Sequence, residues 1–277
     1  MERRILLPTD FSDNAWSALV YALKLYQDEV CTFYLLNSTI VNVPIMSYHL
    51  SDKVVKNIEA EAKKELLELK DMAETSNANS NHSFDIIASS LDLKDSIEIV
   101  ISKYDIDLII MGTKGATGAK EFFFGTNTVH VINKINKCPV LVVPEEFDFV
   151  VPKQIAFATD FYRFYSDMEL KPLKQLADLY NSKIRIVHIN VEKKLNDIQE
   201  YNLEKLKSYL EDYEYSFHWM PKYEKKTIEI NDFIIDLNID IIAMVNYRNS
   251  FIERIIKEPV VNNIGFQPII PFLVIPE

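Results

Sequence analysis

The chain contains an internal duplication, and this feature restricts its fold more than any other. The opening segment "RILLPTDFSDNAWSALVYALKLY" is matched 150 residues later by "KQIAFATDFYRFYSDMELKPLKQLADLY", with Thr9-Asp10-Phe11 aligned on Thr159-Asp160-Phe161. The ends of the halves match as well, "DLIIMG" with "DIIAMV" and "CPVLVVPE" with "IPFLVIPE". Two copies of one unit therefore account for the 277 residues, and we expect domains at 1–147 and 148–277.

Each half alternates short apolar runs with helical patterns, which is typical of a parallel sheet covered by helices. The predicted strands are 4–8, 32–36, 83–88, 107–111 and 139–143 in the first half, and 154–158, 184–189, 214–219, 240–245 and 271–275 in the second. The expected fold class is α/β, with two tandem doubly wound domains that each hold a five-stranded parallel sheet and about four helices.

Helices are predicted where apolar residues recur at spacings of three and four. This pattern runs from Ala15 to Tyr26 and from Val55 to Ala73 in the first half, and from Leu203 to Tyr213 in the second. The segments 39–51 and 75–81 are polar or contain proline, so we predict loops there.

Charge and composition exclude several classes of protein. A net charge of −11 and a pI near 5.0 argue against a surface that coats nucleic acid, which needs dense lysine and arginine. The start "MERRILLPTDF" predicts neither a signal peptide nor a membrane span. Cys31 and Cys138 lie beside apolar runs without metal-ligand spacing, so we expect reduced, buried thiols in a cytoplasmic protein.

Glycine is concentrated in one place. Four of the five glycines lie between Gly112 and Gly125, directly after the apolar strand "DLIIM" and before the helical pattern "GTNTVHVINKI". Glycine lets a backbone turn sharply or approach a ligand closely, and helix N-termini after parallel strands attract anions. The cluster therefore predicts a phosphate site, although it matches neither G-x-x-x-x-G-K-[ST] nor G-x-G-x-x-G.

The spacing that is present, G-x-x-G followed after nine residues by G-T, resembles the ATP-binding motif of the universal stress protein family. "ILLPTDFSDNAWSAL", "MGTKG" and "KCPVLVVP" are similar to the opening strand, fourth strand and closing strand of that family. The resemblance covers both halves and so suggests the tandem, two-domain type. It implies the adenine nucleotide alpha-hydrolase-like form of the parallel sheet.

The resemblance also implies the residues of a nucleotide site in the first half. Asp10 would contact the sugar, and Ser38 would lie beside the adenine. The full set implied is Pro8, Thr9, Asp10, Ser38, Met111, Gly112, Gly115, Gly125, Thr126, Asn127 and Thr128. The cofactor implied is ATP with Mg²⁺. Asn37 departs from the family pattern, in which a histidine is common, as at His188 of the second half.

The second half lacks the glycine cluster. Alignment places Val245 at the position of Gly112 and Arg248 at that of Gly115. A β-branched and a bulky side chain would fill the space and resist the backbone angles that glycine allows. We therefore expect one nucleotide site per chain, in the first half.

Several residues have a structural interpretation beside the functional one. Asp10 could belong only to a helix-initiating turn with Ser12 as the N-cap. His130 is isolated, and no nucleophile and base, carboxylate pair or metal-ligand set predicts a defined reaction beyond slow ATP hydrolysis. The run Phe122–Phe124 either anchors the glycine loop or docks a partner, and the sequence leaves both open.

The function expected from this resemblance is that of a cytoplasmic stress-response protein that binds ATP in its N-terminal domain and acts as a nucleotide-responsive regulator. The alternative is a nucleotide-free interaction scaffold of the same fold. The resemblance further implies self-association through the last strands, 139–143 and 271–275, with the two halves packed as an internal pseudo-dimer. By the same analogy, two chains are expected to pair again as a dimer. A protein partner is expected but not identified, and neither nucleic acid nor membrane is expected.

Overall fold

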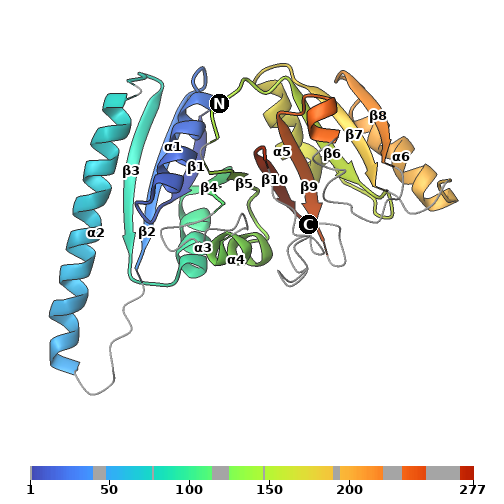
Figure 1. The fold of residues 1–277 in the computed structure, drawn as a ribbon. Helices are drawn as coiled ribbons and strands as arrows, with labels where there is room; N and C mark the ends of the chain where they lie inside the picture. Colours follow the sequence, from blue (N-terminus) through green and yellow to red (C-terminus); the bar gives the residue numbers. More distant parts are fainter. Residues whose placement is uncertain are drawn as a thin grey trace. The chain divides into compact units, whose positions relative to one another are not determined.

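A computed structural model describes residues 2–39, 48–76, 78–113, 125–145, 147–189, 194–220, 233–247 and 269–277. The chain divides into two compact units, Met1–Glu146 and Phe147–Glu277. Figure 1 traces both as α/β structures. No described helix is both long enough and apolar enough to cross a bilayer.

The first unit is a five-stranded parallel sheet in the order β3-β2-β1-β4-β5, as predicted. Its elements are β1 (Arg3–Pro8), α1 (Asp13–Leu25), β2 (Cys31–Ser38), α2 (Tyr48–Ser76), β3 (His82–Ser89), α3 (Leu93–Tyr104), β4 (Leu108–Gly112), α4 (Thr126–Lys134) and β5 (Val140–Val143).

The strand order explains where the helices lie. The chain moves outward from β1 through β2 to β3, then returns to the other side of β1 for β4 and β5. Because crossovers between parallel strands are right-handed, α1 and α2 cover one face, and α3 and α4 cover the other. The reversal of direction lies between β1 and β4, which is where doubly wound sheets bind ligands.

The core of this unit is the sheet itself. Ile5, Leu6 and Leu7 of β1 are nearly inaccessible, and Phe33 of β2 is fully buried and stacks on Phe84 at 5.4 Å. Strands covered on both faces are continuously apolar. That pattern is clear in β1, β2 and β4 and is the reason these strands could be predicted to within a residue or two, whereas the edge strand β3 has several exposed residues.

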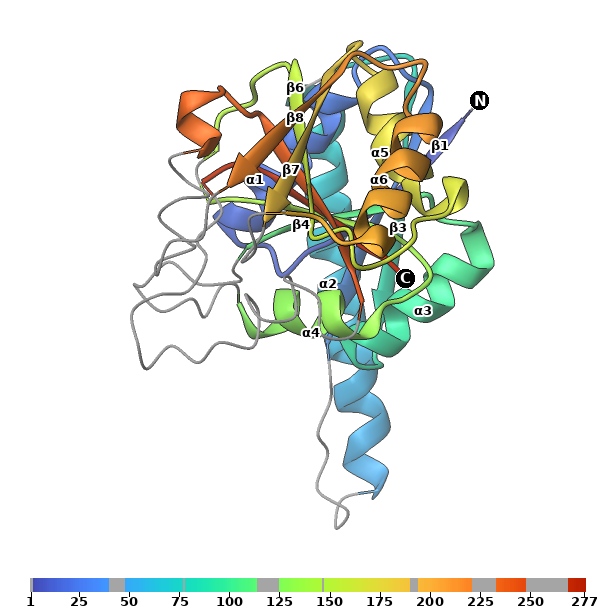
Figure 2. The same ribbon diagram turned by 90° about the vertical axis from the view of Figure 1, so that its right-hand side faces the viewer.

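Two predicted loop boundaries in the first unit were wrong. Residues 48–51 and 75–76 were expected in loops, but they begin and end α2, a helix of 29 residues. At 1.5 Å per residue α2 is about 43 Å long, whereas the 8 residues of β3 span only about 26 Å. Figures 1 and 2 accordingly show α2 extending past the carboxyl end of β3. Residues 40–47 of the expected loop lie outside the described residues.

The second unit repeats the sheet in the order β10-β9-β6-β7-β8, again with every pair parallel. Its elements are β6 (Gln154–Thr159), α5 (Asp167–Asp178), β7 (Lys183–Ile189), α6 (Asp197–Tyr209), β8 (Tyr215–Met220), β9 (Ile241–Asn246) and β10 (Phe272–Pro276). A further helical segment occupies 233–236. The rest of the expected helical content falls outside the described residues of this unit.

We predict that Phe33→Ala lowers the free energy of unfolding by about 3–5 kcal/mol, because it removes a fully buried ring and leaves a cavity. Urea unfolding followed by circular dichroism measures this. Val30→Ala is the control, since Val30 is 52% exposed and should change stability by less than about 0.5 kcal/mol. Equal effects of the two changes would contradict the assigned core.

We predict that neither thiol reacts with a disulfide reagent in the native protein. Cys31 and Cys138 are both buried, and burial raises the pKa of Cys31 to about 12 and that of Cys138 further. The reactive thiolate is therefore scarce at about pH 8. The coloured product of the disulfide reagent should form at least about a hundredfold more slowly with native protein than with urea-unfolded protein. Rapid reaction of either native thiol would contradict this placement.

Candidate functional site

The turn after β1 lies at the carboxyl edge of the first sheet and is held by its own side chains. Thr9 Oγ1 accepts from the backbone N–H of Phe11 at 3.0 Å, and Phe11 has a positive φ of 62°. Asp10 Oδ1 accepts from Ser12 N at 3.2 Å and Ser12 Oγ at 2.6 Å. Ser12 in turn caps α1. Asp10 thus has the structural role considered from the sequence, and its exposed carboxylate stands at the predicted site.

The end of β2 supports this turn. Asn37 is buried, and its Nδ2 donates to the carbonyl of Thr9 at 2.9 Å. In the second unit His188 Nδ1 lies 3.2 Å from the carbonyl of Thr159, the corresponding atom. The asparagine therefore makes the same backbone contact as the histidine. This departure from the family pattern leaves the turn intact.

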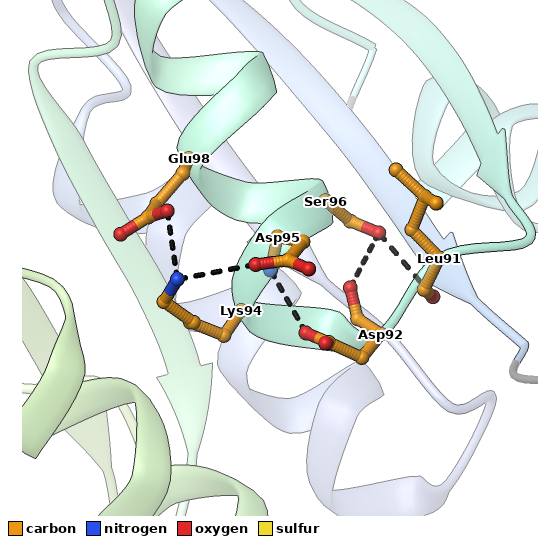
Figure 3. Close-up of polar contacts among 6 residues, drawn as sticks. All are labelled: Leu91, Asp92, Lys94, Asp95, Ser96 and Glu98. Atoms are coloured by element: carbon orange, nitrogen blue, oxygen red, sulfur yellow. Dashed lines mark hydrogen bonds and ion pairs between the residues drawn. The ribbon is translucent and has the colours of Figure 1, made fainter.

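Ser38, the residue expected beside an adenine, donates its hydroxyl to the carbonyl of Leu91 at 2.7 Å. Figure 3 shows how the turn between β3 and α3 that carries Leu91 is fixed. Asp92 caps α3 by accepting from Asp95 N at 2.9 Å, and Ser96 Oγ donates to the Asp92 carbonyl at 2.7 Å. The backbone hydrogen bond from Asp95 holds the pKa of Asp92 below its ordinary value. Leu91 is 46% exposed and presents an apolar side chain at this edge.

Gly112 ends β4 beside the first turn of α1. A Cβ placed on Gly112 would lie 2.7–2.8 Å from the carboxamide atoms of Asn14, closer than real side chains come. Asn14 is buried in the first turn of α1. A side chain at this position would therefore displace the Asn14 carboxamide, so glycine allows β4 and α1 to pack as they do. Met111, which precedes it, is buried within the sheet.

Helix α4 begins beside Gly112. Thr128 is buried, and its hydroxyl donates to the Gly112 carbonyl at 2.9 Å, which ties the first turn of α4 to the end of β4. Gly125 is the N-cap, and within the described residues no side chain caps this helix. Thr126 and Asn127 are exposed. The N–H groups of the first turn therefore lie at the reversal between β1 and β4, where they favour an anion.

The predicted residues thus come from three neighbouring strand ends and one helix start. Pro8 ends β1 and is followed by Thr9 and Asp10, Ser38 ends β2, Met111 and Gly112 end β4, and Gly125 caps α4, which begins with Thr126, Asn127 and Thr128. Gly115 and the run Phe122–Phe124 lie outside the described residues.

The same position in the second unit is closed by side chains. Val245, which replaces Gly112, is buried. Two residues on, the Tyr247 hydroxyl contacts both carboxylate oxygens of Asp160, at 2.9 and 3.0 Å. Gln199 Nε2 donates to the Asp160 carbonyl at 2.8 Å, which ties α6 to the same turn. The aspartate that would face a sugar is engaged within the protein.

Aromatic rings complete this closure. Phe161 is 1% exposed and stacks on His188 at 4.6 Å, and Trp219 meets His188 edge-on at 4.8 Å. Burial lowers the pKa of His188, so the ring is neutral at physiological pH. The turn at Asp160 is therefore packed against side chains rather than open to a ligand.

Comparison with known proteins identifies the family. The model of the universal stress protein family matches residues 1–144. This chain is a universal stress protein. A universal stress protein of Methanocaldococcus jannaschii, MJ0577, is 36% identical over 160 residues, which cover 52% of this chain and 95% of that protein. A second from the same organism, MJ0531, is 32% identical over 148 residues, or 51% of this chain and 81% of that protein.

Solved structures extend the likeness over both halves of this universal stress protein. One from Archaeoglobus fulgidus matches 99% of this chain and 98% of its own, with a TM-score of 0.69 and 18% identity. A protein of Pseudomonas aeruginosa described as a putative universal stress protein matches 99% of this chain and 93% of its own, with a TM-score of 0.57 and 12% identity. These likenesses show the fold and confirm the tandem type.

Three residues near the carboxyl edges of the two sheets were not predicted from the sequence. Asn14 lies in a helix pattern with no sign that it packs under Gly112, and Leu91 follows a serine-rich turn. Tyr247 sits directly after the aligned strand, at the position of Lys114, and that alignment could have singled it out. Its partner Asp160 is 87 residues away, a pairing that only the fold brings about.

We predict that Tyr247→Phe destabilises the second unit by about 1.5 kcal/mol, because it removes a hydrogen bond to a carboxylate. Burial, with nearby Tyr165 and Asp160, raises the pKa of Tyr247 above its ordinary 10.0. The folded state then holds this proton more tightly than the unfolded state, so the contribution is complete below about pH 10 and declines at higher pH.

Urea midpoints of wild type and variant at about pH 8 and about pH 10.5 test this, and the difference between them should shrink at the higher pH. Tyr162→Phe is the matched control, because Tyr162 is 53% exposed on the same turn. A Tyr247→Phe protein as stable as that control at the lower pH would refute the closure.

Proposed function

We propose that the first unit binds one adenine nucleotide, ATP, with its phosphates at the N-terminus of α4 and its sugar near Asp10. The observation that carries this proposal is the start of α4. Its first-turn N–H groups have no side-chain cap among the described residues, and Thr128 fixes them beside Gly112 at the strand-order reversal. Phosphate binds helix N-termini through such groups.

The fit of the nucleotide is supported by hydrogen-bond donors around the end of β4. Thr128 holds the start of α4 against the carbonyl of Gly112. Thr126 and Asn127 are exposed and offer hydroxyl and amide donors, while Ser38 and Leu91 border the opposite part of the edge. A planar base next to Leu91 would bury apolar surface.

Magnesium would accompany the phosphates rather than occupy a protein site. The described residues contain no group of three or more His, Cys, Asp or Glu side chains able to hold a metal. Mg²⁺ is commonly bound through substrate phosphates and water with few protein ligands. Its role would be to neutralise triphosphate charge near Asp10.

We infer that the protein acts as a nucleotide-responsive regulator, with the second unit retaining the fold but not the ligand. The contrast between Gly112 and Val245, and the engagement of Asp160 by Tyr247, support a single site per chain. The competing function is a scaffold that works by protein contact alone. It is favoured only by the second unit, whose fold persists with its edge closed.

Calorimetric titration of Mg-ATP into nucleotide-stripped protein tests the proposal. We predict saturable binding at close to one site per chain, weakened at least about tenfold by Gly115→Arg, which copies the second-half residue Arg248. The arginine would add bulk and charge where glycine is implied.

Tyr247→Phe serves as the matched control, because it alters the second unit and should leave the stoichiometry unchanged. Two sites per chain would show that the second unit also binds nucleotide. No binding by folded, stripped wild type would refute nucleotide binding and leave the scaffold function.

A further inference from the structure

A cleft of about 410 Å³ lies in the first unit between the start of α1 and the C-terminal half of α2. Trp16 of α1 and Leu69 and Met72 of α2 supply apolar lining, together with Phe11. Met72 is 52% exposed on a helix that packs on the sheet. The cleft therefore offers apolar surface that the unit itself does not cover.

The polar part of the cleft is acidic. Asp13, Glu65 and Glu68 line it, all exposed, and none of the described residues that line it is basic. Glu68 also pairs with Lys64 at 3.6 Å on the same helix, but exposed pairs of this kind are weak. An occupant that complements the cleft must join apolar groups to positive charge.

The dimensions favour a helical segment. Glu65, Leu69 and Met72 follow one stripe of α2, and this stripe is about 10 Å long at 1.5 Å per residue. Two turns of a partner helix have the same length. Amphipathic helices bind such grooves through apolar residues at i, i+3 or i+4, and i+7.

We propose that this cleft docks a basic amphipathic helix of a partner protein, with apolar side chains against Trp16, Leu69 and Met72 and lysine or arginine facing the three carboxylates. Trp16 would provide the aromatic anchor that dominates many interfaces. The proposal does not require nucleotide binding. The cleft nevertheless includes Thr9 and Ser12, so the partner would contact the turn that carries Asp10.

The test uses the emission of Trp16 in the full chain. Trp219→Phe removes the other of the two tryptophans, so that Trp16 alone reports. The probe is a synthetic lysine-leucine amphipathic peptide of about 18 residues, long enough to form a helix. We expect a saturable change in emission with this peptide. We expect none with the peptide in which glutamate replaces lysine, or with the one in which serine replaces leucine.

Substitutions of residues that line the cleft test whether the peptide binds there. Glu65→Gln combined with Glu68→Gln should weaken peptide binding about fivefold, and Met72→Gln should weaken it further by removing apolar contact. The matched control is Asp71→Asn combined with Glu74→Gln, which removes two exposed charges from α2 outside the cleft. All four acidic side chains are exposed, so the fold should tolerate both pairs.

Equal loss of binding in the two double variants would show only attraction to an acidic protein and would overturn the proposal. Absence of a saturable change would do the same. Trp16 emission that depends on protein concentration without peptide would identify a second copy of the chain as the occupant, and would also overturn it.

Discussion

The structure depends on parallel pairing of one central strand with two neighbours. β1 pairs with β2 on one side and β4 on the other, and both its faces are buried. Parallel strands require crossover connections, which bring every carboxyl end to one edge of the sheet. The crossovers on either side of β1 run in opposite directions, so the loops after β1 and β4 diverge there. Strand pairing alone therefore determines where the predicted site lies, whichever residues occupy it.

The two units share the same sheet and the same turn after the first strand, but they differ in the residues at the end of the fourth strand. The Thr-Asp-Phe turn has the same geometry in both, with φ of 62° at Phe11 and 58° at Phe161, each held by the preceding threonine hydroxyl at 3.0 Å. That turn therefore has a structural role independent of a ligand. What differs is the end of the fourth strand, where Gly112 has no side chain and lies against Asn14, whereas Val245 has a buried side chain and Tyr247 bonds to Asp160.

Much of the fold was predictable because burial on both faces leaves a clear sequence pattern. The duplication, all ten strands and their parallel arrangement followed from apolar runs alternating with helical spacing. The start of α2 was not predicted, because the segment 39–51 contains Pro44 and several polar residues, which favour a loop, whereas α2 already begins at Tyr48. The contacts of Gly112 and Thr128 at the end of β4 were not predicted from the sequence.

The sequence by itself determined the family, the repeated α/β architecture and the contrast between the halves, because these are properties of order and spacing along the chain. Tertiary structure decided which distant residues meet. Asn14 packs under Gly112, Ser38 bonds to the turn at Leu91, Tyr247 takes the carboxylate of Asp160, and α1 and α2 enclose the acidic cleft. Each of these pairs is far apart in sequence, and only the crossovers bring them within a few ångströms. Periodicity records which face of an element is buried, but not which side chain lies opposite.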